Sequence, residues 1–282
     1  MLGTGWTEAV ALAAAFLIAV LATPAGISGA VLLLPFQVSV LGTPSPSVTP
    51  TNLLYNVVAT PGALYRYWRQ GQAVGPLAGL LIAGTLPGVV AGSIIRVEVL
   101  PSPRVFDLVV AAVLLPLGVW LALTRPPGAV AGAVAGTDEG TPPVRPPRHP
   151  PVIPRPVLVL LAAAVGCVGG IYGIGGGSIL APVLTGTGRP PSEVAPAALA
   201  STFVTSVAGV VTFTLLSLHG HGPVAPDWPT GIALGLGGLA GAYLGARIQP
   251  RLPDRLIRRL IGILVAAIAG RYLWSGLGPW FG

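Results

Sequence analysis

Hydrophobic residues in this chain gather in long runs that contain almost no charge. Residues 9–65, 156–188 and 194–226 contain no Asp, Glu, Lys or Arg. Because a run of about 18 or more apolar residues is long enough to cross a bilayer as a helix, these runs predict membrane spans or groups of spans. We expect hydrophobic elements over residues 8–40, 51–68, 74–95, 105–123, 156–188, 194–217, 228–246 and 256–274.

The sequence repeats itself across two halves. The segment GISGAVLLLP at residues 26–35 aligns without a gap with GIGGGSILAP at residues 173–182. Two glycine ridges follow at equal spacing, Gly84, Gly88 and Gly92 in the first half and Gly237, Gly241 and Gly245 in the second. Residues 124–155, between the halves, are rich in Pro, Gly and Arg, which predicts an extended linker. We therefore predict a first transmembrane repeat (1–123), a cytoplasmic linker (124–155) and a second transmembrane repeat (156–282).

The first element of each half is too long for one span. Residues 8–40 and 156–188 each hold 33 residues, whereas a spanning helix needs about 20. Glycines lie near the middle of both elements. Since irregular backbone at membrane depth persists only where protein or a watery cavity satisfies its polar groups, we expect a re-entrant or broken helix in each.

The arginines test this expectation, because cytoplasmic loops carry an excess of positive residues. If each first element crosses the membrane once, the fifteen arginines divide seven to eight. If each returns to its starting side, twelve share one face, and only Arg96, Arg104 and Arg271 lie opposite. The second arrangement gives each half an odd number of crossings, so the repeats are inverted and both termini lie outside the cytoplasm. It leaves no arginine near the membrane centre.

Composition agrees with a membrane protein and excludes several soluble classes. Only 8% of the residues are charged and the mean hydropathy is +0.82, whereas about a quarter of the residues of a soluble domain are charged. The net charge of +7 comes from arginines between hydrophobic runs, so it does not indicate nucleic-acid binding. The chain has no G-x-x-x-x-G-K-[ST] loop for ATP and no Ser, His and carboxylate set for hydrolysis. We expect neither an enzyme nor a primary pump.

Cysteine and histidine offer little chemistry. Cys167 lies in an apolar stretch, so we interpret it as a buried structural thiol, with a reactive nucleophile as the weaker alternative. His219 and His221 lack a third metal ligand and are expected in a solvated loop. We expect no metal site and no cofactor.

The glycine breaks are the first candidate for a binding site. Glycine lets a ligand approach the backbone closely, and amide N–H groups at a helix start attract anions through the helix dipole. The alternative is close helix packing through small residues, which is common in membranes and which we expect for the two glycine ridges. Recurrence of the break in both halves favours an anion site. Its candidate residues are Gly26, Ser28 and Gly29 in the first half and Gly173, Gly175, Gly176, Gly177 and Ser178 in the second.

Polar side chains after each break are the second candidate. Asn52, Asn56 and Thr60 are four residues apart and share one helical face, and a run of hydroxyls, Ser201 to Ser206, occupies the equivalent place in the second half. Buried amides and hydroxyls serve either as glue between helices or as ligand contacts, and both interpretations stay open. We expect the site to be lined by Asn52, Asn56, Thr60, Ser201, Thr202 and Thr205.

With GIYGIGGGSILAP at residues 170–182, followed by VAPAALAS at residues 194–201, the chain resembles the TauE/SafE family, the sulfite exporter and toluenesulfonate uptake permease group. The resemblance spans both halves, although GISGAVLLLP in the first half has fewer of the glycines. It implies a multi-pass permease of the bacterial inner membrane that moves sulfur-containing anions such as sulfite or organosulfonates.

We predict an all-α polytopic membrane protein of two inverted repeats, each a glycine-broken first element followed by three transmembrane helices. The predicted function is secondary transport of small anions, sulfite or organosulfonates, by alternating access. Two alternatives stay open. One is a membrane assembly or chaperone-like subunit in which the glycines only pack helices, and the other is a membrane enzyme that acts through Cys167.

Overall fold

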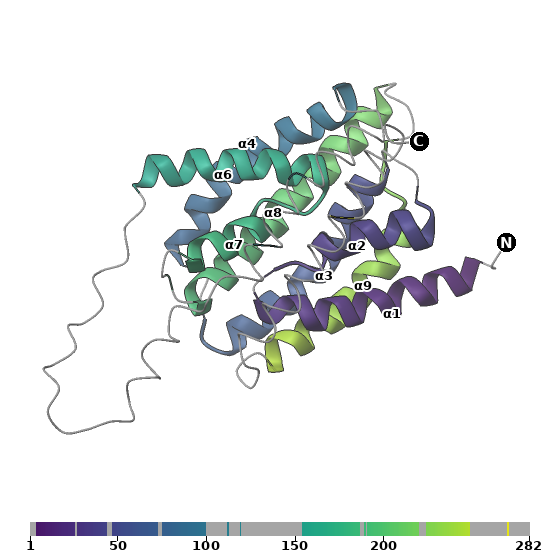
Figure 1. The fold of residues 1–282 in the computed structure, drawn as a ribbon, viewed down its shortest axis with the longest axis horizontal. Coiled ribbons are helices and arrows are strands. Elements are labelled where there is room, and N and C mark those ends of the chain that lie inside the picture. Colours follow the sequence, from purple (N-terminus) through teal and green to yellow (C-terminus); the bar gives the residue numbers. More distant parts are fainter. Residues whose placement is uncertain are drawn as a thin grey trace, which may run out of the picture.

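The computed structural model describes most of both halves, and within the described residues the regular structure is entirely helical. The predicted elements at 105–123 and 256–274 and the linker at 124–155 lie outside the described residues, apart from single positions. Figure 1 shows the helices gathered side by side. The described residues are 4–25, 27–43, 47–72, 75–99, 112, 119, 154–186, 189, 191–219, 224–248 and 270.

Four of the described helices are long and apolar enough to cross a membrane. They are α4 (Pro76–Glu98), α6 (Arg155–Tyr172), α8 (Pro191–Leu218) and α9 (Trp228–Ile248). A fifth long helix, α3 (Val48–Arg69), carries buried amides and hydroxyls among its apolar residues, which makes it less apolar than the other four. These lengths and compositions are those of the predicted polytopic membrane protein.

The first element of the first half is a discontinuous helix. Helix α1 (Thr4–Ala22) ends in a single 3-10 turn, η1 (Thr23–Ala25), and an irregular stretch separates it from α2 (Ala30–Phe36). A π-helical turn, η2 (Gln37–Leu41), continues α2. Gly42 then ends the segment with a φ of +66°, a conformation that glycine adopts without strain.

The second half is interrupted at the equivalent place. Helix α6 ends at Tyr172, Gly173 and Gly175 have φ angles of +81° and +71°, and α7 (Gly177–Gly186) begins two residues later. Only glycine takes these φ values readily, so the G-I-G-G-G sequence determines where the helix breaks.

The two glycine ridges pack helices from opposite halves of the sequence together, α4 against α6 and α9 against α1. A methyl group on Gly84 would lie 2.5 Å from the Ala162 Cβ of α6, and one on Gly88 would overlap the Ala163 carbonyl oxygen. The second ridge meets α1 in the same way, since methyl groups on Gly237 and Gly241 would overlap the carbonyl oxygens of Leu12 and Phe16. The interpretation of both ridges as packing surfaces is confirmed.

Each of these pairs is parallel, because the contact positions rise together along both helices, from Gly84 to Gly92 on α4 and from Ala162 to Cys167 on α6. Figure 1 shows α4 beside α6 at one edge of the molecule and α1 beside α9 at the other. Helices α3 and α9 also pack in parallel, with Leu54 against Gly231 and Val58 against Gly235.

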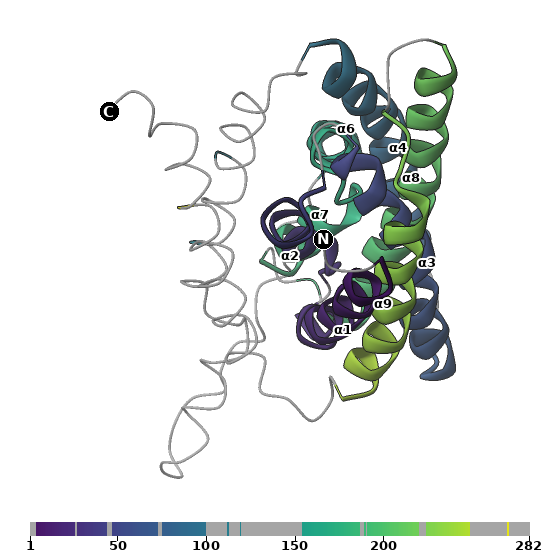
Figure 2. The same ribbon diagram turned by 90° about the vertical axis from the view of Figure 1, so that its right-hand side faces the viewer.

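These contacts divide the described helices into two bundles that exchange one helix between the repeats. The α1 bundle contains α1, α2, α3 and α9, and the α6 bundle contains α4, α6, α7 and α8. They meet mainly where α3 packs against α8, and Figure 2 shows these two helices side by side along one flank. Each bundle therefore contains helices from both halves of the sequence.

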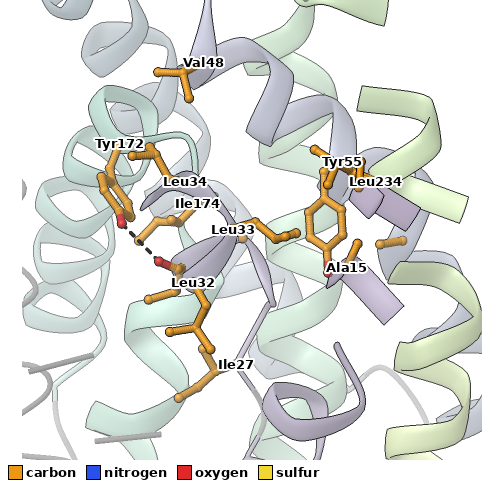
Figure 3. Packing of buried hydrophobic residues seen from close by; sticks show 14 residues of the cluster. Ala15, Ile27, Leu32, Leu33, Leu34, Val48, Tyr55, Tyr172, Ile174 and Leu234 are labelled. Carbon is orange, nitrogen blue, oxygen red and sulfur yellow. Dashed lines mark hydrogen bonds between the residues drawn. The ribbon is translucent and has the colours of Figure 1, made fainter. Parts of the chain in front are cut away.

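A buried apolar cluster fixes α2 beneath the second break. Leu33 and Leu34 of α2 pack with Tyr172 and Ile174 near the end of α6. The Tyr172 hydroxyl donates a 3.0 Å hydrogen bond to the Val31 carbonyl, as Figure 3 shows. The two breaks are thus held close to each other at the junction of the bundles.

Candidate functional site

The predicted site residues are buried between the bundles. None of the eight polar side chains is more than 6% exposed, and the described glycines of both breaks are buried as well. Gly26 lies outside the described residues. The polar set is Ser28, Asn52, Asn56, Thr60, Ser178, Ser201, Thr202 and Thr205.

In the first half, the break is tied to α3 through Ser28 and Asn56. The Ser28 hydroxyl donates a 2.5 Å hydrogen bond to Asn56 Oδ1, and Ser28 Oγ accepts one of 3.2 Å from the Ala30 amide. The first bond fixes the orientation of the Asn56 amide, so its NH₂ group points away from the serine. The second satisfies an N–H group at the start of α2, as a capping serine does.

Asn52 links α2 and η2 to α3. Its Nδ2 donates to the Ala30 carbonyl at 2.9 Å, and its Oδ1 accepts from Gln37 Nε2 at 3.1 Å. Both ends of the amide are therefore engaged within the protein. This geometry makes Asn52 a positioning residue for the first break, whereas Asn56 keeps a donor free.

In the second half, four predicted site residues are already paired. The Gly176 amide donates to Thr205 Oγ1 at 3.2 Å, and the Ser178 hydroxyl donates to the Ile174 carbonyl at 3.2 Å. Ser201 Oγ lies 2.8 Å from Thr85 Oγ1 on α4. These bonds hold the break against α8 and join α8 to α4.

Three donor groups near the breaks have no hydrogen-bond partner. They are Asn56 Nδ2, Thr202 Oγ1 and Ser206 Oγ, and all three side chains are fully buried. Elsewhere on α8 the hydroxyls of Thr205, Thr212 and Thr214 bond to the carbonyl four residues back. Leaving a buried polar group unpaired costs about 1–3 kcal/mol, so these three groups are the candidates for hydrogen bonds to a ligand.

The register of α3 against α8 places these three groups within two neighbouring turns. Leu53 packs against Gly209, and Ala63 shares a buried cluster with Leu199, so the helices run antiparallel. Between these contacts, steps of three and four residues lead from Leu53 through positions 56 and 60 to Ala63 on α3. The same steps lead from Leu199 through positions 202 and 206 to Gly209 on α8. Residues at such steps share one helix face, so the intermediate positions lie on the facing sides of α3 and α8. Asn56 is thereby level with Ser206, and Thr60 with Thr202.

The glycines of the second break border the free hydroxyls. A methyl group on Gly175 would lie 3.0 Å from Ser206 Oγ, and one on Gly177 would lie 2.6 Å from Thr202 Oγ1. Side chains at either position would fill the space beside these hydroxyls. The break therefore leaves Thr202 and Ser206 facing bare backbone.

The electrostatics of this region are those of a neutral site rich in donors. Among the described residues no buried side chain is a carboxylate or a histidine, and no group of three His, Cys, Asp or Glu side chains could hold a metal. Amide NH₂ and hydroxyl groups donate to oxyanions without adding charge. Such a site suits a small anion that is bound with moderate affinity and then released.

Three buried polar residues were not among the predicted lining residues. Ser206 belongs to the predicted hydroxyl run but not to the predicted lining, although its spacing of four from Thr202 was available as a signal. Thr85 gives no sequence signal because it stands alone in an apolar helix. Arg96, expected in a loop, instead lies within the last turn of α4 and is fully buried.

Cysteine and histidine take no part in the described site. Cys167 is half-buried on α6, where its backbone carbonyl faces Gly92. His219 is exposed at the end of α8, and its ring Nδ1 lies 2.7 Å from the Leu215 carbonyl oxygen. His221 lies outside the described residues.

Comparison with known proteins identifies the family. A sequence model of the family described as Sulfite exporter TauE/SafE matches residues 11–272, a range that includes both breaks, both glycine ridges and the linker. No curated protein and no solved structure matches the chain. The match covers nearly the whole sequence, and the chain therefore belongs to the TauE/SafE sulfite exporter family.

Proposed function

We propose that this chain carries sulfite or small organosulfonates across the bacterial inner membrane by alternating access, at a site between α3 and α8. Membership of the family makes the chain a multi-pass membrane transporter of sulfur-containing anions and not an enzyme. The identity of the anion, the position of the site and the mechanism are the parts proposed here.

The observation that carries the proposal is the set of three free donors. Asn56 Nδ2, Thr202 Oγ1 and Ser206 Oγ are buried within two neighbouring turns, and they come from facing helices of the two bundles. An oxyanion with three oxygens accepts one hydrogen bond from each. Sulfite and the sulfonate group both present three oxygens on one sulfur, which fits this number of donors.

Directions of the helices support the proposed inverted repeats. Helix α4 ends the described part of the first half and runs parallel to α6, which begins the second. In the topology with twelve arginines on the cytoplasmic side, α4 and α6 both start at that side, whereas α1 and α9 both start at the other. Both parallel pairs agree with the inverted arrangement, and the parallel packing of α3 with α9 favours it, because those two helices would be antiparallel if each first element crossed the membrane once.

Alternating access then takes the form of a rocking motion between the two bundles. Moving one sequence half against the other would break the contacts of both glycine ridges, α4 with α6 and α9 with α1, where the helix backbones lie close together. Moving the α1 bundle against the α6 bundle keeps these ridge contacts intact and changes mainly the contact of α3 with α8, where the proposed site lies. The bundles, rather than the halves, are the moving units of our proposal.

Energetics favour export. An anion that leaves a cell with a negative interior gains about 2.3 kcal/mol per charge for each 100 mV, so export needs no coupled ion. No carboxylate is buried among the described residues, and none is therefore placed to relay a proton through the site.

The test is a flux panel with the purified protein in liposomes. Sulfite, sulfate, thiosulfate, organosulfonates and carboxylates are compared with and without an imposed proton gradient. Saturable flux of sulfite or a sulfonate, abolished by Asn56→Asp, is the expected result. Absence of any saturable flux would support the assembly-subunit alternative, and flux without selectivity would leave the sulfur assignment without support.

A further inference from the structure

Two exposed arginines end neighbouring helices on the same side of the molecule. Arg69 is the last residue of α3, and Arg247 lies in the last turn of α9. The two helices run in parallel, and near their ends the Gln70 side chain donates a 3.4 Å hydrogen bond to the Ala246 carbonyl. Gln70 and Ala246 are the sequence neighbours of the two arginines, which therefore lie at one level.

A stacked pair of tyrosines shows which helix faces carry the arginines. The rings of Tyr65 on α3 and Tyr243 on α9 have centroids 6.4 Å apart and planes 25° from parallel. Arg69 follows Tyr65 by four residues, and Arg247 follows Tyr243 by four. Since residues four apart share one helix face, both arginines leave their helices on the side of the stacked rings, one turn closer to the helix ends.

The positive charge at this end has no carboxylate partner in the described part of the protein. The ion pair found there joins Arg189 to Glu193 and uses neither Arg69 nor Arg247. Arg66, one turn before Arg69, leaves its buried Nε without a hydrogen-bond partner. Like charges on adjacent helices repel each other, and one anion between them removes the repulsion while it accepts hydrogen bonds from both guanidinium groups.

An exposed apolar row on α9 leads up to these arginines. Ile232, Leu236 and Leu239 form this row and are 44%, 51% and 37% exposed. Steps of four, three, four and four residues lead from Ile232 along the row to Tyr243 and then to Arg247. Residues at such steps share one helix face, so the apolar row, the tyrosine and the arginine form a continuous strip.

An exposed tryptophan marks the level of the membrane surface beside the strip. Trp68 is 70% exposed, and its ring centroid lies 6.1 Å from that of Tyr65. Tryptophan and tyrosine gather at the level of the lipid headgroups, where one end of the ring meets hydrocarbon and the other meets water. The arginines therefore lie at headgroup level, and the apolar row extends from there toward the membrane centre.

We propose that Arg69 and Arg247 bind the phosphate of an anionic phospholipid, with an acyl chain of the same lipid along the apolar row. A free phosphate ion would use the arginines but not the row, so the row favours a lipid. In the proposed topology this end faces the cytoplasm, where anionic lipids attract basic residues. The lipid joins α3 of the first half to α9 of the second, both in the α1 bundle. This inference does not depend on which anion is transported.

The experiment measures the Kd of phosphatidylglycerol for the purified protein in detergent, from the lipid-bound fraction in native mass spectrometry. Arg69→Gln and Arg247→Gln are each expected to raise this Kd about fivefold, and the double variant about thirtyfold, through the lost attraction of one or two arginines for an anionic lipid. Arg155→Gln, at an exposed arginine that begins α6, is the matched control and is expected to keep the wild-type Kd.

Two further ligands identify what occupies the surface. Phosphatidylcholine, whose choline cation cancels the phosphate charge, is expected to bind the wild type about tenfold more weakly than phosphatidylglycerol. Inorganic phosphate carries the charge without acyl chains and is expected to leave phosphatidylglycerol bound at equal concentration. Displacement by inorganic phosphate at that concentration would identify a simple anion site and overturn the lipid assignment.

The inference is also overturned by an unchanged Kd in the double variant, or by equal affinity of the wild type for the two lipids, a result that needs no variant. None of these measurements requires transport. Absence of sulfite flux would therefore overturn the proposed function and leave the lipid site standing, whereas sulfite flux with unchanged lipid binding in the double variant would do the reverse.

Discussion

Thr202→Val tests the proposed site with an almost isosteric change. The substitution replaces a fully buried hydroxyl without a hydrogen-bond partner by a methyl group. Removing an unsatisfied buried hydroxyl relieves a desolvation penalty of about 1–3 kcal/mol, so the variant without anion is expected to be more stable by about that amount. An anion bound by wild type gains a charge-assisted hydrogen bond worth about 1.5–3 kcal/mol, so its KM should rise about tenfold to a hundredfold in the variant.

The two effects have opposite signs, which is the signature of a group kept for function rather than for folding. Stability is measured as the thermal midpoint in detergent without anion, and KM as sulfite flux in proteoliposomes. Thr212→Val is the matched control, because the Thr212 hydroxyl already bonds to the Ala208 carbonyl at 2.8 Å and lies outside the site. A Thr202→Val protein that is less stable than wild type and keeps its KM would refute the reasoning.

Two further sets of substitutions test the Asn56 donor and the glycine contacts between α4 and α6. Asn56→Asp replaces the free NH₂ group by a carboxylate oxygen in a neutral site. The variant is expected to abolish sulfite flux, because a hydrogen-bond donor is lost and the carboxylate repels the anion. Sulfite flux within a factor of two of wild type would contradict this role of Asn56. Gly88→Ala would drive a methyl group into the Ala163 carbonyl and is expected to lower the thermal midpoint, whereas Gly79→Ala, with no atom within 4 Å, should raise it slightly through helix propensity. Equal thermal midpoints for the two glycine variants would contradict the close packing of α4 against α6.

Local chemistry made the breaks predictable. Gly173 and Gly175 take φ angles that other residues avoid, so the glycine-rich sequence itself specifies where α6 ends. The ridges were predictable as packing surfaces for a similar reason, since glycines four residues apart form a flat helix face.

Which helix each ridge packs against, and in which register, depends on tertiary packing and could not be predicted from the sequence. Nothing in the ridge sequence states that Gly88 meets Ala163 of the other half. The Gly176 amide, predicted as an anion donor, is occupied because the register of α8 places Thr205 beside it. The free donors at Ser206 and Thr202 arise from that same register. Arg96 marks a predicted helix end by its charge, yet α4 continues to Glu98 and the Arg96 side chain is fully buried.

The central claim is that a sulfur oxyanion crosses the membrane at the donors shared by α3 and α8. The most direct measurement is counterflow of radiolabelled sulfite into liposomes that contain the wild-type protein, Asn56→Asp or Thr212→Val. The account predicts saturable counterflow in the wild type and in Thr212→Val and none in Asn56→Asp, with all three proteins equally folded. Equal counterflow in all three, or none in the wild type, would contradict it.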